Sequence, residues 1–107
     1  MKLRQLAHSR TGDKGDTLNV SVVCHDSRDY AHVLRHVTSE RVKTHLRDVV
    51  QGEVTRYELP LIGAMNFVLG RALGGGVTRS LALDAHGKSL SSALLDLEIP
   101  ARDEKGL

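Results

Sequence analysis

The residues best suited to chemistry lie in one short polar segment at residues 9–16. The segment reads Ser-Arg-Thr-Gly-Asp-Lys-Gly-Asp, so cations, carboxylates, hydroxyls and glycines stand close together. The same composition is typical of a solvated turn whose charges pair weakly at the surface. Spacing alone favours the turn and leaves an anion site and a cation site as the functional alternatives.

The cations of this segment could bind an anion. Arg10 and Lys14 offer charged donors, and Gly12 and Gly15 expose backbone that a phosphate or carboxylate can approach closely. Asn19 follows shortly afterwards and could orient such a ligand. The segment matches neither GxxxxGK[ST] nor GxGxxG, so it predicts no nucleotide loop of those two kinds.

The carboxylates provide the second alternative. Asp13 and Asp16 stand three positions apart, which suits either a hard cation such as Mg²⁺ or a base that abstracts a proton. His86, close to Lys88, is a further candidate base, although a turn that leads into a helix explains that cluster more simply. The candidate catalytic residues are therefore Asp13, Asp16 and His86, and we expect no dedicated metal centre.

Composition limits the classes of function. The chain has 107 residues, a formal net charge of +2 and 3% aromatic residues, which does not suit a nucleic-acid-binding surface. Cys24 is the only cysteine, which excludes an intrachain disulfide and a CxxC zinc site. Cys24 and His25 would point to opposite faces of a strand and form no nucleophile pair. The sequence shows neither an apolar leader nor an apolar run of membrane-spanning length, and it predicts a cytoplasmic protein without membrane contact.

Hydrophobic periodicity predicts a single α+β domain at residues 1–100 and a flexible tail at residues 101–107. The polar residues 9–16 are expected to form a loop. The expected strands cover residues 3–7, 18–23, 53–59 and 77–83, and in the second of them Leu18, Val20 and Val22 are expected to face inward. The expected helices begin near residues 28, 39, 62 and 88, with a strand at 95–99 as the alternative end of the last helix. We expect one sheet of about four strands, mainly antiparallel, with helices packed on one face. The exposed face of such a sheet predicts a homo-oligomer.

Four stretches of the chain resemble, in order, the AtuA-like ferredoxin-fold domain. They are residues 7–21 with the string GDKGD, 52–60, 66–81 with LGGGVTRSL, and 84–95. The two strings are specific when they occur together in this order, and the resemblance covers about residues 3–99. It implies a ferredoxin-like sandwich and a functional role for residues 9–16. The substrate or anion-binding residues expected on this basis are Arg10, Gly12, Lys14, Gly15, Asn19, Arg79 and Lys88.

The resemblance also implies a function. In that family the domain usually follows a much larger domain in proteins of acyclic terpene utilisation, and it also occurs as a separate short chain, which this chain looks like. The resemblance therefore implies an accessory subunit of an AtuA-type large subunit in acyclic terpene or branched acyl (isoprenoid) catabolism. The alternative is part of a site for an anionic acyl-CoA or carboxylate, centred on residues 9–16, with Mg²⁺ or a coenzyme A ester as the bound species. Whether the chain is catalytic stays open at this point.

Overall fold

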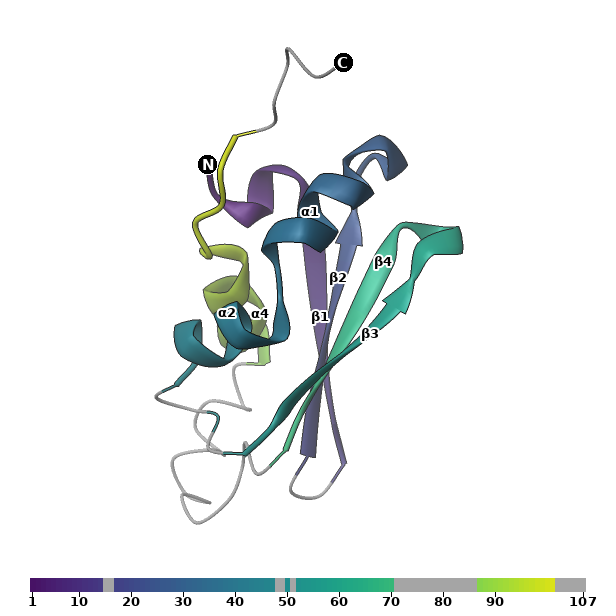
Figure 1. Ribbon diagram of the computed structural model, residues 1–107. Coiled ribbons are helices and arrows are strands. Elements are labelled where there is room, and N and C mark those ends of the chain that lie inside the picture. The colour runs from purple at the N-terminus through teal and green to yellow at the C-terminus, as the bar shows by residue number, and fades with distance from the viewer. Residues whose placement is uncertain (15–16, 48–49, 51, 71–86, 102–107) are drawn as a thin grey trace.

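Four antiparallel strands form one sheet in the computed structural model of the chain, which describes residues 1–14, 17–47, 50, 52–70 and 87–101. The strands β1 (Ala7–Lys14), β2 (Thr17–Cys24), β3 (Val54–Leu59) and β4 (Ala64–Leu69) lie in the order β1-β2-β4-β3. The helices α1 (Tyr30–His36), α2 (Ser39–His45) and α4 (Gly87–Leu95) all lie on one side of this sheet (Figure 1). The expected α+β sandwich, with helices on one face of an antiparallel sheet of four strands, is confirmed.

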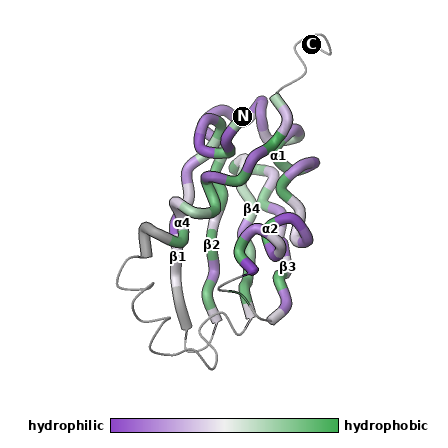
Figure 2. The backbone as a smooth tube through the Cα atoms, turned by 90° about the vertical axis from the view of Figure 1, so that its left-hand side faces the viewer, coloured by the Kyte–Doolittle hydropathy of each residue, from purple (hydrophilic) through white to green (hydrophobic). Residues whose placement is uncertain are grey.

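Alternation along the strands gives the sheet two different faces. Leu18, Val20 and Val22 are fully buried, as expected, and they face the helices, which lie in front of the sheet in Figure 2. The register of the three strand pairs places the intervening residues on the other side, which we call the open face. The open face includes His8, Arg10, Gly12, Asn19, Ser21, Val23, Thr55, Tyr57, Leu59, Ala64, Asn66 and Val68.

The hydrophobic core lies between the sheet and the helices. Phe67 on β4 is its largest fully buried side chain, and α1, α2 and α4 contribute Val33, Val42 and Leu94, all with no exposed area. The contacts of α4 are mainly with β1. Each short helix therefore covers part of one sheet face, which makes the packing of that face the main source of stability.

Side-chain caps start the helices near the expected residues. Asp26 accepts a hydrogen bond from the Arg28 backbone N–H at 2.9 Å, at the start of a 3-10 turn (Ser27–Asp29) that leads into α1. Thr38 accepts one from the Arg41 N–H at 3.2 Å and begins α2. The predicted helices at residues 28 and 39 are confirmed.

The predicted loop at residues 9–16 is wrong for residues 9–14, because β1 runs through Lys14 and pairs with β2 over its whole length. Pairing with β2 provides partners for the backbone groups of alternate residues in this segment, which outweighs the weak strand propensity of Gly and Asp. Residues 15–16 lie outside the described residues. The predicted first strand at residues 3–7 is also wrong, since Leu3–Gln5 is a 3-10 helix and the strand begins at Ala7.

The predicted helix from residue 62 is wrong as well, because Ala64–Leu69 is strand β4. This strand lies between β2 and β3, and residues on both of its faces are buried or half-buried. A strand of that kind reads as a continuous apolar run, which periodicity does not distinguish from a buried helix. The pairing of β4 with two neighbours decides the structure.

The last helix is confirmed as α4, which ends at Leu95. The residues that follow bond to the start of the chain: the Leu3 N–H donates to the Leu97 carbonyl, and the Ile99 N–H donates to the Met1 carbonyl, each at 2.9 Å. The alternative prediction of a full strand at residues 95–99 is therefore wrong, and the β-pairing of this segment within the described residues is an isolated bridge between Lys2 and Glu98. The predicted strand at 77–83 and nearly all of the predicted flexible tail lie outside the described residues.

Gly63 joins β3 to β4 after a 3-10 turn (Pro60–Ile62), and it has a positive φ of 61°. An added Cβ would lie 3.6 Å from Ser27, an ordinary contact, so backbone strain is the main cost of a side chain here. We expect Gly63→Ala to lower the free energy of unfolding by about 1–2 kcal/mol. Urea denaturation checks this value, and Gly63→Asn, which tolerates this φ better, should lose less.

Candidate functional site

A row of polar residues crosses the open face, with one residue from each strand. The strand registers align Arg10 with Ser21, Ser21 with Asn66, and Asn66 with Tyr57. Directly opposed residues of antiparallel strands have Cβ atoms about 4.5–5.5 Å apart, so neighbours in this polar row are within reach of one ligand. The polar row thus presents a guanidinium, a hydroxyl, a carboxamide and a phenol on one surface.

Hydrogen bonds position the first two members of the polar row. The Arg10 backbone N–H donates to Ser21 Oγ at 3.2 Å, and Ser21 Oγ lies 3.4 Å from the Arg10 carbonyl oxygen. Arg10 is exposed, and within the described residues no carboxylate forms an ion pair with it. Its guanidinium can therefore bind a carboxylate or phosphate from solution by donating hydrogen bonds to it.

Gly12 and Asn19 form the next pair along the same face. They are register partners, and a Cβ on Gly12 would lie only 2.8 Å from Asn19 Oδ1. The missing side chain at Gly12 thus leaves room for the Asn19 carboxamide to lie across β1. Asn19 is exposed beside the polar row, which makes it a further donor for the same ligand.

The other expected site residues do not all join this surface. Asp13 and Lys14 end β1, where their backbones pair with Leu18 and Thr17, and their side chains lie outside the described residues. Lys88 belongs to the first turn of α4, a helix on the opposite side of the sheet. The structure thus brings together Arg10, Gly12 and Asn19, and their binding roles stay predictions. Gly15, Asp16, Arg79 and His86 lie outside the described residues.

A second group of hydroxyls lies between β1 and α4. Thr11 Oγ1 and Ser91 Oγ are 2.5 Å apart, and Ser91 is buried. Ser9 Oγ is also buried and has no hydrogen-bond partner within the described part of the chain. The hydrogen bond between Thr11 and Ser91 attaches α4 to β1 on the helix side of the sheet. The alternation of Ser9 and Thr11 with His8 and Arg10 could have indicated this division, had the segment been recognised as a strand.

Cys24 ends β2 with its thiol turned into the core. Burial raises the pKa of the Cys24 thiol to about 11, with smaller contributions from the negative charges of Asp29 and Asp26. The neighbouring His25 is exposed and stacks on His8, with ring centroids 5.6 Å apart. The expectation that Cys24 and His25 form no nucleophile pair agrees with these positions.

We expect the Cys24 thiol of the folded chain to react about 100-fold more slowly with iodoacetamide at pH 8 than the thiol of the unfolded chain, because its thiolate fraction is smaller by roughly that factor. The rate should rise with pH as the pKa near 11 is approached. Mass spectrometry with and without urea measures both rates. Equal rates would contradict the buried position of the thiol.

An exposed apolar hairpin is the feature that sequence reasoning missed most clearly. Within the described residues, the large hydrophobic side chains left exposed are Tyr57, Leu59, Leu61 and Ile62, at 54%, 43%, 100% and 66%. They all belong to β3 and the turn that follows it, at the right of Figure 1. We call residues 57–62 the apolar hairpin. The predicted helix from residue 62 concealed this run, because it placed Ile62 in the core.

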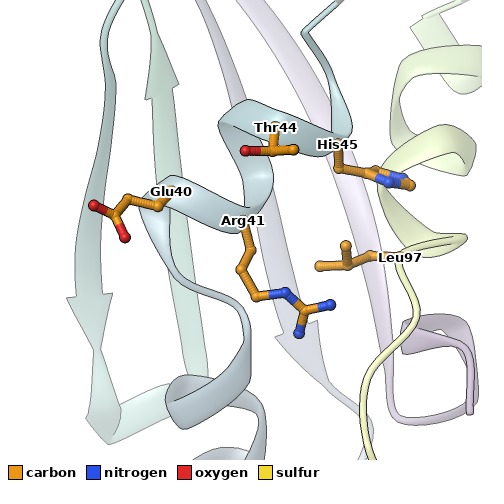
Figure 3. Close-up of a pocket in the computed structure, with 5 residues that line it drawn as sticks. All are labelled: Glu40, Arg41, Thr44, His45 and Leu97. Atoms are coloured by element: carbon orange, nitrogen blue, oxygen red, sulfur yellow. The ribbon is translucent and has the colours of Figure 1, made fainter.

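A pocket of about 300 Å³ lies between α2 and the segment after α4 (Figure 3). It is lined by Glu40, Arg41, Thr44, His45 and Leu97. Arg41 donates from Nη2 to the Glu98 carbonyl at 2.6 Å, and His45 Nε2 donates to the Ala93 carbonyl at 2.6 Å. These two side chains connect α2 to α4 and to the segment that follows α4. None of the expected site residues is part of this lining.

In the described parts of the chain, no group of three or more His, Cys, Asp or Glu side chains is arranged to hold a metal ion. Within the same parts, no helix has the length and apolarity needed to cross a membrane.

Comparison with known proteins places the whole described domain in one family. The family model of the AtuA ferredoxin-like domain matches residues 1–100. Curated proteins and solved structures offer no match. The chain therefore belongs to the AtuA ferredoxin-like domain family.

Proposed function

We propose that the chain acts in the cytoplasm as an interaction subunit, which associates with itself and with a separate AtuA-type large protein in the catabolism of acyclic terpenes or branched acyl compounds. The apolar hairpin is the observation that supports this proposal. Large apolar side chains on a protein surface normally occur singly, whereas here they gather in one run that includes a fully exposed leucine. The family match points to an AtuA-type protein as the partner.

The geometry suits docking into an apolar groove. Leu61 and Ile62 project from a turn in which Pro60 fixes its own φ and the Gly63 N–H donates to the Pro60 carbonyl at 3.1 Å, so the backbone beneath them is restrained. A rigid apolar turn loses little conformational entropy when a partner covers it. Leu61 and Ile62 are therefore the anchor residues of the proposed contact.

Co-expression with an AtuA-type large protein tests this association. The chain carries an affinity tag after residue 107, and we expect it to retain the large protein through purification. Leu61→Asp combined with Ile62→Asp should weaken the complex at least 10-fold, since two charges would enter the apolar contact. Ala31→Asp, on the exposed side of α1, is the matched control and should bind normally. Failure to retain the large protein, or equal binding by both variants, would refute the proposal.

The polar row favours a second candidate function, the binding of an anionic acyl ligand. Arg10 would pair with a carboxylate or phosphate of a coenzyme A ester, and Asn66 and Asn19 would donate further hydrogen bonds. Ser21 would donate only by turning its one proton from the Arg10 carbonyl toward the ligand. Asp13, predicted from the GDKGD string to bind a hard cation, would contact the same ligand through Mg²⁺. This function would add catalysis or ligand sensing to the interaction role.

Thermal unfolding with acetyl-CoA, free carboxylates and Mg²⁺ tests the second function. A ligand present at about 100 times its Kd stabilises the folded state by about 2.7 kcal/mol, which shifts the midpoint by several degrees. We expect Arg10→Gln to abolish the shift given by acetyl-CoA, and Arg35→Gln, an exposed arginine on α1, to preserve it. The absence of a shift with every ligand would leave the interaction role alone.

A further inference from the structure

Strand β3 ends the sheet on the side away from β1, within the part of the chain that the structure describes. The direction of its backbone groups follows from one bond: the Gly70 N–H donates to the Glu53 carbonyl at 2.8 Å. Antiparallel pairs alternate, so Thr55, Tyr57 and Leu59 also direct their backbone groups toward β4. Arg56 and Glu58 then direct theirs outward. Among the described residues no strand pairs with this outer edge of β3, so the outward backbone groups of Arg56 and Glu58 can pair with a further strand.

We infer that this edge binds a second copy of the chain, with the two β3 strands antiparallel about a twofold axis at Tyr57. In this register Arg56 lies opposite Glu58 of the second copy, and Glu58 opposite Arg56 of the second copy. Both pairs consist of residues whose backbone groups face outward, so each can exchange two hydrogen bonds. The two four-stranded sheets join into one continuous sheet.

Charge selects this register over its neighbours. Moving the axis to Arg56 would place two guanidinium groups opposite each other, and moving it to Glu58 would do the same with two carboxylates. Like charges directly opposite each other destabilise a strand pair, whereas opposite charges stabilise it. Within one chain, Arg56 Nη2 already lies 3.4 Å from Glu58 Oε2, so both side chains stand on the same face. The axis at Tyr57 is the symmetric choice that pairs these charges between copies.

The same register buries apolar surface on the open face. Tyr57 meets Tyr57 of the second copy in a non-hydrogen-bonded pair, where side chains approach most closely. Leu59 meets Thr55 of the second copy. The exposed fractions of Tyr57 and Leu59, 54% and 43%, are thereby reduced, and the polar row continues across both copies. Leu61 lies beyond the paired residues and stays available to a large partner.

This inference deepens the self-association in the proposed function and rests on it. The two associations are tested separately, because self-association is measured on the purified chain without the AtuA-type large protein. Either proposal can therefore fail while the other stands.

Single cysteines test the register directly. In a Cys24→Ala background, Tyr57→Cys is expected to form a disulfide-linked dimer under mild oxidation, because the two Cβ atoms of such a pair lie within reach of a disulfide. Thr55→Cys and Leu59→Cys should each stay uncrosslinked, yet a mixture of these two variants should form a mixed dimer. Homodimers of Thr55→Cys or Leu59→Cys would overturn the register, and the absence of any crosslink would overturn the pairing.

Sedimentation equilibrium provides a measurement without cysteines. We expect a dimer at about 100 μM, and Glu58→Lys should raise its dissociation constant at least 10-fold, since a lysine would oppose Arg56. Glu53→Lys makes the same charge change at an exposed residue outside the paired strands and should leave the dimer intact. A monomeric wild type, or equal behaviour of the two variants, would overturn the proposal. Circular dichroism spectra confirm that both variants are folded.

Discussion

Replacing Phe67 by alanine is expected to lower the free energy of unfolding by about 3–5 kcal/mol. The side chain of Phe67 is fully buried and is the largest in the core. Its register partners, Val20 on β2 and Arg56 on β3, belong to the same helix-facing side. Truncation leaves a cavity that a sheet paired on both sides cannot close. Because a domain of this size has only about 5–15 kcal/mol of stability, the variant should be close to unfolding at room temperature.

Val68→Ala is the matched control for Phe67→Ala. Val68 is the next residue on β4, lies on the open face and is half-buried, so its truncation should cost about 1 kcal/mol or less. Urea denaturation of both variants measures the difference. Similar losses at the two positions would contradict the alternation of β4 and favour a segment buried on all sides.

The local sequence was sufficient to predict those helices and strands whose pattern or ends are marked by residues within the segment itself. Strand β2 alternates apolar and polar residues, and its inward set Leu18, Val20 and Val22 was predicted correctly. Asp26 and Thr38 indicate where helical segments begin, because the side-chain oxygen of each accepts a hydrogen bond from a backbone N–H of the first turn. Such features depend on neighbours in sequence, so they can be recognised without the rest of the fold.

Strand β4 shows where local signals are insufficient. Its apolar run at residues 64–69 suits a buried helix and a central strand equally, and the choice depends on pairing with β2 and β3. The polar row could not be predicted for the same reason. Asn66 and Tyr57 reach the side of Ser21 only through strand registers that join distant parts of the chain.

Strand β1 shows what such an error does to a site prediction. As a loop, residues 9–14 could direct all their side chains toward one ligand. As a strand, they divide between two faces: Arg10 and Gly12 lie on the open face, whereas Thr11 bonds to Ser91 on the helix side. Arg10 and Asn19 therefore remain together as candidates, and their neighbours are Ser21 and Asn66 from the polar row.

Arg56 is expected to be the position outside the apolar core where a substitution lowers the free energy of unfolding most. Its Nη1 donates to the carbonyl oxygens of Leu34 and Val37, at 2.6 and 2.8 Å, and its side chain is only 19% exposed. These carbonyls belong to the C-terminal end of α1, where the helix itself offers no donors and where a positive charge is favoured. The arginine thus attaches α1 to β3.

Arg56→Ala should lower the free energy of unfolding by about 2–4 kcal/mol, because two partly buried carbonyls lose a charged donor. Arg56→Lys should lose less, since it keeps the charge but lacks the planar fork. Arg35→Ala, an exposed arginine on α1, is the control and should change stability by no more than about 0.5 kcal/mol. Hydrogen exchange of Arg56→Ala should show the largest loss of protection in α1. Equal stability of the Arg56→Ala and Arg35→Ala variants would mean that solvent replaces these two hydrogen bonds at no cost, and that α1 is held by its apolar face alone.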